Sequence, residues 1–253
     1  PNVLAAADIA GVDSVFTVGG AQAIAAMAFG TESIPPVDIV CGPGNIFVTL
    51  AKKLLYGQVG IDGLEGPTET LIIADENANP AFCAADLLGQ AEHDILATPV
   101  LITTDENLVS KVQHQLDIQL AGMKKRDTIS LSLDTRAVIV IVDKLTDAIE
   151  IANIYAPEHL CLMVSEPRDL VCNIKNAGGI FLGSNSPEVM GDYVAGPSHV
   201  MPTGGTARFN SSLGVSNFLK RIPVVDLNDS TSKMLIQTAS RIARVEGLEA
   251  HAR

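Results

Sequence analysis

The chain has 253 residues, of which 47% are hydrophobic and 18% are charged, enough for one large or two medium globular domains. Its formal net charge of −12 argues against a nucleic-acid partner, because the phosphate backbone binds basic surfaces. No apolar run approaches the roughly 18 residues of a membrane-spanning helix, so no membrane association is expected.

The cysteines and the first residues bear on the location of the protein. No CxxC spacing occurs among the four cysteines (Cys41, Cys83, Cys161 and Cys172), and most of them lie in apolar runs. This pattern favours buried free thiols in a reducing, cytoplasmic environment. Residues 1–7 have the pattern of a helix interior and not of a signal peptide, so we expect an N-terminal portion to precede them.

The first segment alternates strand and helix patterns. We expect strands at 12–18 and 37–41, each followed by a glycine turn, and helices at 21–27 and 46–56. Two strand–glycine–helix units fit a parallel sheet with a nucleotide at its carboxyl edge, where glycine and a helix N-terminus accept phosphate. Neither turn is a GxGxxG motif and no acidic ribose-binding residue is evident, so purely structural turns are a strong alternative.

A second and longer α/β run follows a glycine-rich loop at residues 57–69. Its expected strands are 71–75, 99–104, 137–143, 159–164 and 178–183. Its expected helices are about 80–93, 106–122, 146–155 and 167–176. We therefore predict an α/β fold of two Rossmann-like parallel-sheet units, the first incomplete, plus a helical C-terminal tail. The expected domains are residues 1–67, 68–213 and 214–253.

The helix that begins after Asn79 is signalled by Asn at the N-cap and Pro80 at the first helical position. Near its end, Gln90 and His93 are three residues apart and so share a face. Imidazole is the commonest zinc ligand and an amide oxygen is a weak one. A polar helix end near solvent is the alternative interpretation.

Glu158 and His159 stand side by side after Pro157, at the start of an apolar run. Proline ends the preceding helix pattern, so both groups are expected at a helix-to-strand junction, a rigid place for proton-handling side chains. An exposed Glu and a half-buried His in a loop is the alternative interpretation.

The stretch 186–209 is rich in turn-forming residues and has little periodicity, and a long irregular loop in a compact domain is usually functional. Within it, Asp192 and His199 are candidate ligands or proton-transfer groups, although either could be an ordinary loop residue. The tail contains an amphipathic helix at about 230–245, followed by Glu246 and His251.

Taken in order, these segments resemble the histidinol dehydrogenase family along essentially the whole chain. The motifs that carry the resemblance are residues 19–25, 42–45, 86–93, 156–160, the loop 191–209 and the tail 246–251. Each motif alone is unspecific, whereas the ordered set is distinctive.

The resemblance implies a role for each matching residue. Glu158 and His159 would form the acid–base pair, and Gln22 and Asn45 would contact NAD. The implied zinc ligands are Gln90, His93, Asp192 and His251. The implied substrate contacts are Thr68, Gln90, His93, His159, Asp192, Glu246 and His251. Thr68 stands where many family members have Ser, a change that keeps the hydroxyl group.

The implied reaction is the oxidation of L-histidinol through histidinal to L-histidine, the last step of histidine biosynthesis, with two hydrides passed to NAD. A histidine with an ordinary pKa of about 6.5 suits proton relay near neutral pH. Nitrogen and oxygen ligands without thiolate fit a metal that holds substrate. A homodimer is expected, with Glu246 and His251 donated by the partner tail, because the apolar face of the tail helix needs a surface to cover it.

Two other functions are compatible with the same motifs. A paralogous zinc- and NAD-dependent dehydrogenase could act on another small alcohol, such as a sulfonated propanediol, although the run 204–209 and Glu246 favour histidinol. A metal-binding remnant without catalysis is the other alternative.

Overall fold

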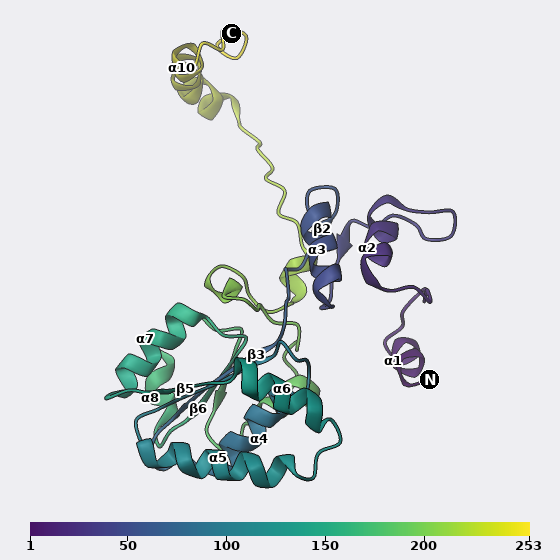
Figure 1. Cartoon of the computed structure of the whole chain (residues 1–253). Helices are drawn as coiled ribbons and strands as arrows, with labels where there is room; N and C mark the ends of the chain where they lie inside the picture. Colours follow the sequence, from purple (N-terminus) through teal and green to yellow (C-terminus); the bar gives the residue numbers. More distant parts are fainter. The chain divides into compact units, whose positions relative to one another are not determined.

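The computed structural model describes all 253 residues, which divide into two compact units, Pro1–Asn217 and Phe218–Arg253. The fold is α/β with parallel sheets, as the sequence predicts (Figure 1). The expected division of the first unit near residue 67 stays a prediction. None of the helices combines the length and the apolar character that a membrane crossing requires.

The centre of the first unit is a five-stranded sheet in which every neighbouring pair is parallel. Its strands are β3 (Glu69–Ala74), β4 (Thr98–Thr103), β5 (Val138–Ile141), β6 (His159–Met163) and β7 (Gly179–Leu182). The strand order is β5-β4-β3-β6-β7, so the chain builds outward on one side of β3 and then crosses to the other. All five strands lie where the sequence predicts them, with shifts of a few residues at their ends.

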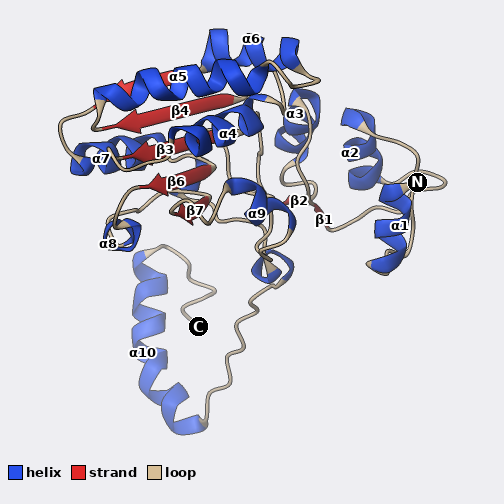
Figure 2. Cartoon of the chain, turned by 90° about the horizontal axis from the view of Figure 1, so that it is seen from below, coloured by secondary structure: helices blue, strands red, loops and turns tan.

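Helices cover both faces of this sheet (Figure 2). On one face, Ile72, Leu101 and Cys161 pack against α4 (Pro80–Ala91) and α5 (Glu106–Leu120). On the other face, Leu71 and Leu160 pack against α7 (Leu145–Tyr155) and α8 (Pro167–Val171). Burial on both faces explains why β3, β4 and β6 read as continuous apolar runs, whereas the edge strand β5 is apolar but largely exposed.

The earlier part of the unit holds a second, two-stranded parallel sheet of β1 (Ile39–Val40) and β2 (Gly60–Ile61). Its helices are α1 (Asn2–Ile9), α2 (Gly20–Phe29) and α3 (Ile46–Leu55). The strand predicted at 12–18 is wrong: this segment is irregular, and Val12, Val15, Phe16 and Val18 are 43–52% exposed. A strand needs the backbone hydrogen bonds of a neighbour, and β1 pairs only with β2.

Several elements were not expected from the sequence. Two are helices of the first unit, α6 (Arg126–Arg136) and α9 (Glu188–Tyr193), and two are short 3₁₀ turns, Thr206–Arg208 and Val215–Phe218. The second unit contains α10 (Asp229–Val245), as predicted. All four cysteines are free; Cys83 and Cys161 are buried as expected, whereas Cys172 is exposed.

Candidate active site

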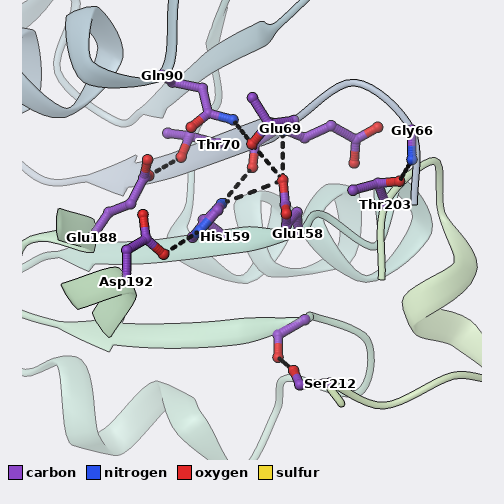
Figure 3. A network of polar contacts seen from close by, with 12 residues as sticks. Gly66, Glu69, Thr70, Gln90, Glu158, His159, Glu188, Asp192, Thr203 and Ser212 are labelled. Atoms are coloured by element: carbon purple, nitrogen blue, oxygen red, sulfur yellow. Dashed lines mark hydrogen bonds and ion pairs between the residues drawn. The ribbon is translucent and has the colours of Figure 1, made fainter. Parts of the chain in front are cut away.

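The predicted acid–base pair lies at the amino-terminal edge of the large sheet. Glu158 and His159 follow the αL residue Ala156 at the end of α7 and open β6, which confirms the helix-to-strand junction. Thr68 directly precedes the neighbouring strand β3, in which Thr70 is the register partner of His159. The starts of two adjacent parallel strands thus bring Thr68 and Glu158, 90 residues apart in sequence, into contact. Figure 3 shows Glu158 and His159 beside Glu69 and Thr70 of the neighbouring strand.

Thr68 connects Gln90 to Glu158. Its hydroxyl donates to Glu158 Oε2 at 2.5 Å and accepts from Gln90 Nε2 at 2.5 Å. The backbone amide of Glu69 donates to the same Glu158 oxygen at 3.0 Å. A carboxylate fixed by two donors has a defined orientation, so the other oxygen of Glu158 is free to meet a substrate or a water molecule.

His159 is oriented by the carbonyl of Glu69, which lies 3.1 Å from Nδ1. Since a carbonyl only accepts, Nδ1 carries the proton of the neutral ring, and Nε2 is left as the basic nitrogen. Asp192 Oδ1 lies 3.5 Å from Nε2, and the ring packs against Phe181 with centroids 5.7 Å apart. In the neutral ring, the basic nitrogen Nε2 therefore faces the carboxylate of Asp192 on α9.

The electrostatics of the pair follow from burial among carboxylates. Burial raises the pKa of Glu158, while the neighbouring His159 and the Thr68 hydroxyl oppose that rise. For His159, burial lowers the pKa, but Asp192, Glu188 and Glu158 together raise it to about 9. In this environment His159 holds a proton readily, and Glu158 is a stronger base than an exposed carboxylate.

Glu188 is a site residue that sequence reasoning missed. It is buried, accepts from the Thr70 hydroxyl, and burial raises its pKa to about 7. With His159 and Asp192 it forms a group whose ligand atoms all lie within 4.8 Å of one another, close enough to hold a metal ion. The spacing of Glu188 and Asp192, four residues apart on one helix face, was the available signal, but the segment was interpreted as an irregular loop.

The acid–base pair and Asp192 line a cavity of about 390 Å³. The predicted residues that line it are Thr68, His93, Glu158, His159, Asp192 and His199. A neighbouring cavity of about 510 Å³ shares His93 and Asp192 and is also lined by Glu188 and Asp86. The structure thus gathers residues from three separate motifs, together with Thr68, at one place.

Gln90 stands behind the cavity wall and has an unusual feature. Its side chain is fully buried, and its Oε1 has no hydrogen-bond partner. A buried amide oxygen without a partner is costly unless it meets a cation or a donor. Together with His93 and Asp192, which border both cavities, this oxygen fits the donor set of a zinc site.

Gln22 and Asn45, which the sequence also predicts, do not line this cavity. Gln22 is exposed in the first turn of α2, and Asn45 is exposed and caps α3 by accepting from the amides of Phe47 and Val48 at 3.1 and 3.2 Å. Glu246 and His251 belong to the second unit. The roles of these four residues stay predictions.

Comparisons with known proteins agree with the motifs. The family model described as histidinol dehydrogenase matches residues 1–253. Histidinol dehydrogenase of Dehalococcoides mccartyi (strain CBDB1) is 53% identical over 249 residues, which cover 98% of this chain and 57% of that protein. The enzyme of that name from Thermus thermophilus is 51% identical over 253 residues, covering 100% of this chain and 61% of that protein.

A solved structure gives the same result. The crystal structure of histidinol dehydrogenase from Elizabethkingia anophelis superposes with a TM-score of 0.92 at 38% identity, covering 97% of this chain and 57% of that one. The chain therefore spans a little over half the length of these relatives. From the ordered motifs, the whole-length family match and these relatives, the chain belongs to the histidinol dehydrogenase family.

Proposed function

We propose that this chain carries the substrate, metal and acid–base residues of a zinc-dependent, NAD-linked dehydrogenase that oxidises L-histidinol through histidinal to L-histidine. The observation that carries the proposal is the hydrogen-bonded series Gln90–Thr68–Glu158, of which Thr68 and Glu158 line one cavity together with His159, His93 and Asp192. The family name of the relatives supplies the reaction, and the site supplies groups for each of its proton transfers.

Zinc would be held by Gln90 Oε1, His93, Asp192 and His251, of which the first is buried without a partner. When bound, it supplies a positive template for the imidazole and amino nitrogens of the substrate. NAD supplies the hydride acceptor, with Gln22 and Asn45 as its contacts. The first turn of α2 fits a cofactor phosphate, because Gly19 at its N-cap makes no side-chain capping bond.

The first oxidation removes a hydroxyl proton and a hydride from the alcohol carbon. Nε2 of His159 takes the proton when the ring is neutral, a form that becomes more abundant as the pH rises toward its pKa of about 9, and the Glu69 carbonyl holds this ring in the correct tautomer. In the second oxidation, Glu158 takes a proton from water as its oxygen adds to the aldehyde carbon, and a second hydride leaves that carbon. The acid forms, and two NAD molecules are reduced for each alcohol consumed.

The charge of the cavity favours a cationic substrate. Its wall includes Glu158 and Asp192, and no lysine or arginine side chain lines it; the carboxylate of Glu65, also at the wall, is paired with Lys52. An amine or imidazolium gains from these carboxylates, whereas the sulfonate of a sulfonated propanediol is repelled by them. The lining therefore supports histidinol over an anionic alcohol.

The proposal is tested with the longest polypeptide that the coding sequence specifies, loaded with zinc. We expect NADH formation with histidinol and with histidinal, and none with a sulfonated propanediol. Glu158→Gln should still oxidise the alcohol but should release histidinal, because water activation is lost. If Glu158→Gln converts histidinol fully to histidine at the wild-type rate, Glu158 does not activate water. If the wild-type protein does not turn over histidinol, the proposed reaction is wrong.

We also propose a homodimer in which Glu246 and His251 complete the partner's site. The support is the surface of α10, where Met234, Leu235 and Ile242 are 45–69% exposed within a unit of 36 residues. A unit of that size is too small for a core of its own, so its apolar helix face needs another surface.

A further inference from the structure

A buried ion cluster lies at the loop before β3 that ends in Thr68, and the reaction described above does not use it. Lys52 on α3 is 1% exposed, and its Nζ lies 2.6 Å from Asp62 Oδ1, 2.7 Å from Glu65 Oε2 and 3.0 Å from the Gly42 carbonyl. An ammonium group has three N–H donors, so each of them has a partner. Lys52, Asp62 and Glu65 are called the lysine cluster below.

The lysine cluster joins the glycine turn before α3 to the loop before β3. Asp62 Oδ2 accepts from the Gly42 amide at 2.6 Å, and the Thr49 hydroxyl donates to the Glu65 carbonyl at 2.6 Å. A Cβ at position 63 would collide with Glu65 Oε1, so the Glu65 side chain passes directly over Gly63. The loop is therefore fixed by several bonds at this end.

The other end of the same loop is part of the site. Gly66 donates its amide to Thr203 Oγ1 at 2.6 Å (Figure 3), and Thr68 contacts both Glu158 and Gln90. Only two residues separate Glu65 from Thr68, which is too short a span to absorb a shift of Glu65 without moving Thr68. A change in how Lys52 holds Glu65 would therefore move the Thr68 hydroxyl, which orients Glu158.

Stability alone is a poor explanation for the lysine cluster. Removing three charges from water is costly, and apolar side chains of similar volume often stabilise a protein as well or better. Charged, hydrogen-bonded groups fix the geometry of each contact, which apolar groups do not. Thr68 needs such a geometry, because its hydroxyl must lie between an amide donor and a carboxylate acceptor.

We propose that Lys52 is a positioning residue for the second oxidation. It holds Glu65, and through residues 65–68 it keeps Thr68 against Glu158, the group that activates water. The inference rests on the proposed function. His159 is oriented by the Glu69 carbonyl and faces Asp192, and it is linked to Thr68 only through its longer 3.6 Å contact with Glu158 Oε2, so the first oxidation depends less on the lysine cluster.

The test uses Glu65→Ala in the full-length protein. This change frees the loop but leaves Lys52 paired with Asp62, so no buried charge is stranded. We expect aldehyde oxidation to fall about tenfold or more, with alcohol oxidation within about threefold of wild type, since small misplacements of a catalytic group are costly. Glu65→Gln keeps an oxygen acceptor for Lys52 and should restore the ratio of the two rates. Lys53→Met, at the exposed lysine next along α3, is the matched control.

Hydrogen exchange of the Gly63 and Gly66 amides reports on the loop without any activity. The proposal requires faster exchange in Glu65→Ala and unchanged exchange in Lys53→Met, together with the selective loss of aldehyde oxidation. An equal loss of both oxidations, or unchanged exchange in Glu65→Ala, would overturn it. If wild type oxidises neither compound, the proposed function fails and the catalytic part of this inference fails with it. The exchange result then still decides whether the lysine cluster holds the loop.

Discussion

Glu69 is a carboxylate beside the site whose ionisation the fold opposes. Burial raises its pKa to about 7, the Gly204 amide opposes the rise by donating to Oε1 at 3.1 Å, and the charge of Glu158 adds to it. The other oxygen, Oε2, is buried without a partner. Because the folded protein holds this proton more tightly than the unfolded chain does, stability contributed by neutral Glu69 is present below about pH 4.5 and is lost as the pH rises through about 7.

Glu69→Gln removes this pH dependence, because glutamine cannot ionise and keeps an oxygen for Gly204. We expect the variant to be more stable than wild type at pH 8, by on the order of 1–2 kcal/mol after allowance for the partial exposure of the side chain. The difference should nearly vanish at pH 4.5. Urea unfolding at both pH values measures it, and a gain of equal size at both would mean that ionisation is not the cause.

At the level of single residues, the sequence predicted the residues that belong to a motif and missed those whose role depends on tertiary contacts. Glu158 and His159 were found from their place after Pro157, and Gln90 and His93 from their spacing on a helix. Glu188 and the lysine cluster were missed because neither a carboxylate four residues from Asp192 nor a lysine on a helix indicates burial by itself. Only the fold brings their partners, such as Thr70, close to them.

Among the elements, α4 shows how local signals determine a segment that carries site residues. Asn79 accepts from the Ala81 amide at 2.9 Å, and Pro80 begins the helix, as predicted. The buried side chains of α4 then pack on the sheet, so that Gln90 at the far end is fixed by tertiary contacts.

Asn79→Ala should therefore lower stability without changing the site. Loss of an N-cap side chain costs about 1 kcal/mol. Since Gln90 lies three turns away and is fully buried, we expect kcat and KM to stay within about twofold of wild type. Urea unfolding and steady-state kinetics check the two parts. Asn79→Asp, which keeps the capping oxygen, should behave as wild type, and a large fall in kcat for Asn79→Ala would show that α4 transmits changes at its start.

Element prediction succeeded for the buried strands β3, β4 and β6 and for the exposed edge strand β5, and it failed where local pattern and tertiary context disagree. The segment 12–18 has a strand composition but no neighbouring strand, so it stays irregular. In contrast, α9 forms within a stretch rich in turn residues, where Glu188 and Gly191 are buried. Strand pairing and helix burial of this kind depend on distant segments, which periodicity does not report.

For the molecule as a whole, the proposed dimer makes a quantitative prediction. His251→Ala and His159→Ala should each be inactive alone. When the two variants are unfolded and refolded together, half of the dimers carry one chain of each kind, and each such dimer has one intact and one doubly damaged site. About a quarter of all sites should regain activity.

Mixing the two folded variants without unfolding them is the control, because stable dimers exchange their chains slowly. Heterodimer formation is verified with two chains of different tag or mass. Proven heterodimers without activity would place His251 in its own subunit's site.

The position of the site at the amino-terminal edge of the sheet has a consequence for its electric field. In a parallel α/β unit the connecting helices run opposite to the strands, so α4 and α7 end at this edge, at Ala91 and Tyr155. The carboxyl end of a helix carries a partial negative charge from its free carbonyls. Two such ends therefore add to the carboxylates in attracting a metal ion and a protonated amine. The phosphates of a dinucleotide are repelled there and must be bound where helices begin.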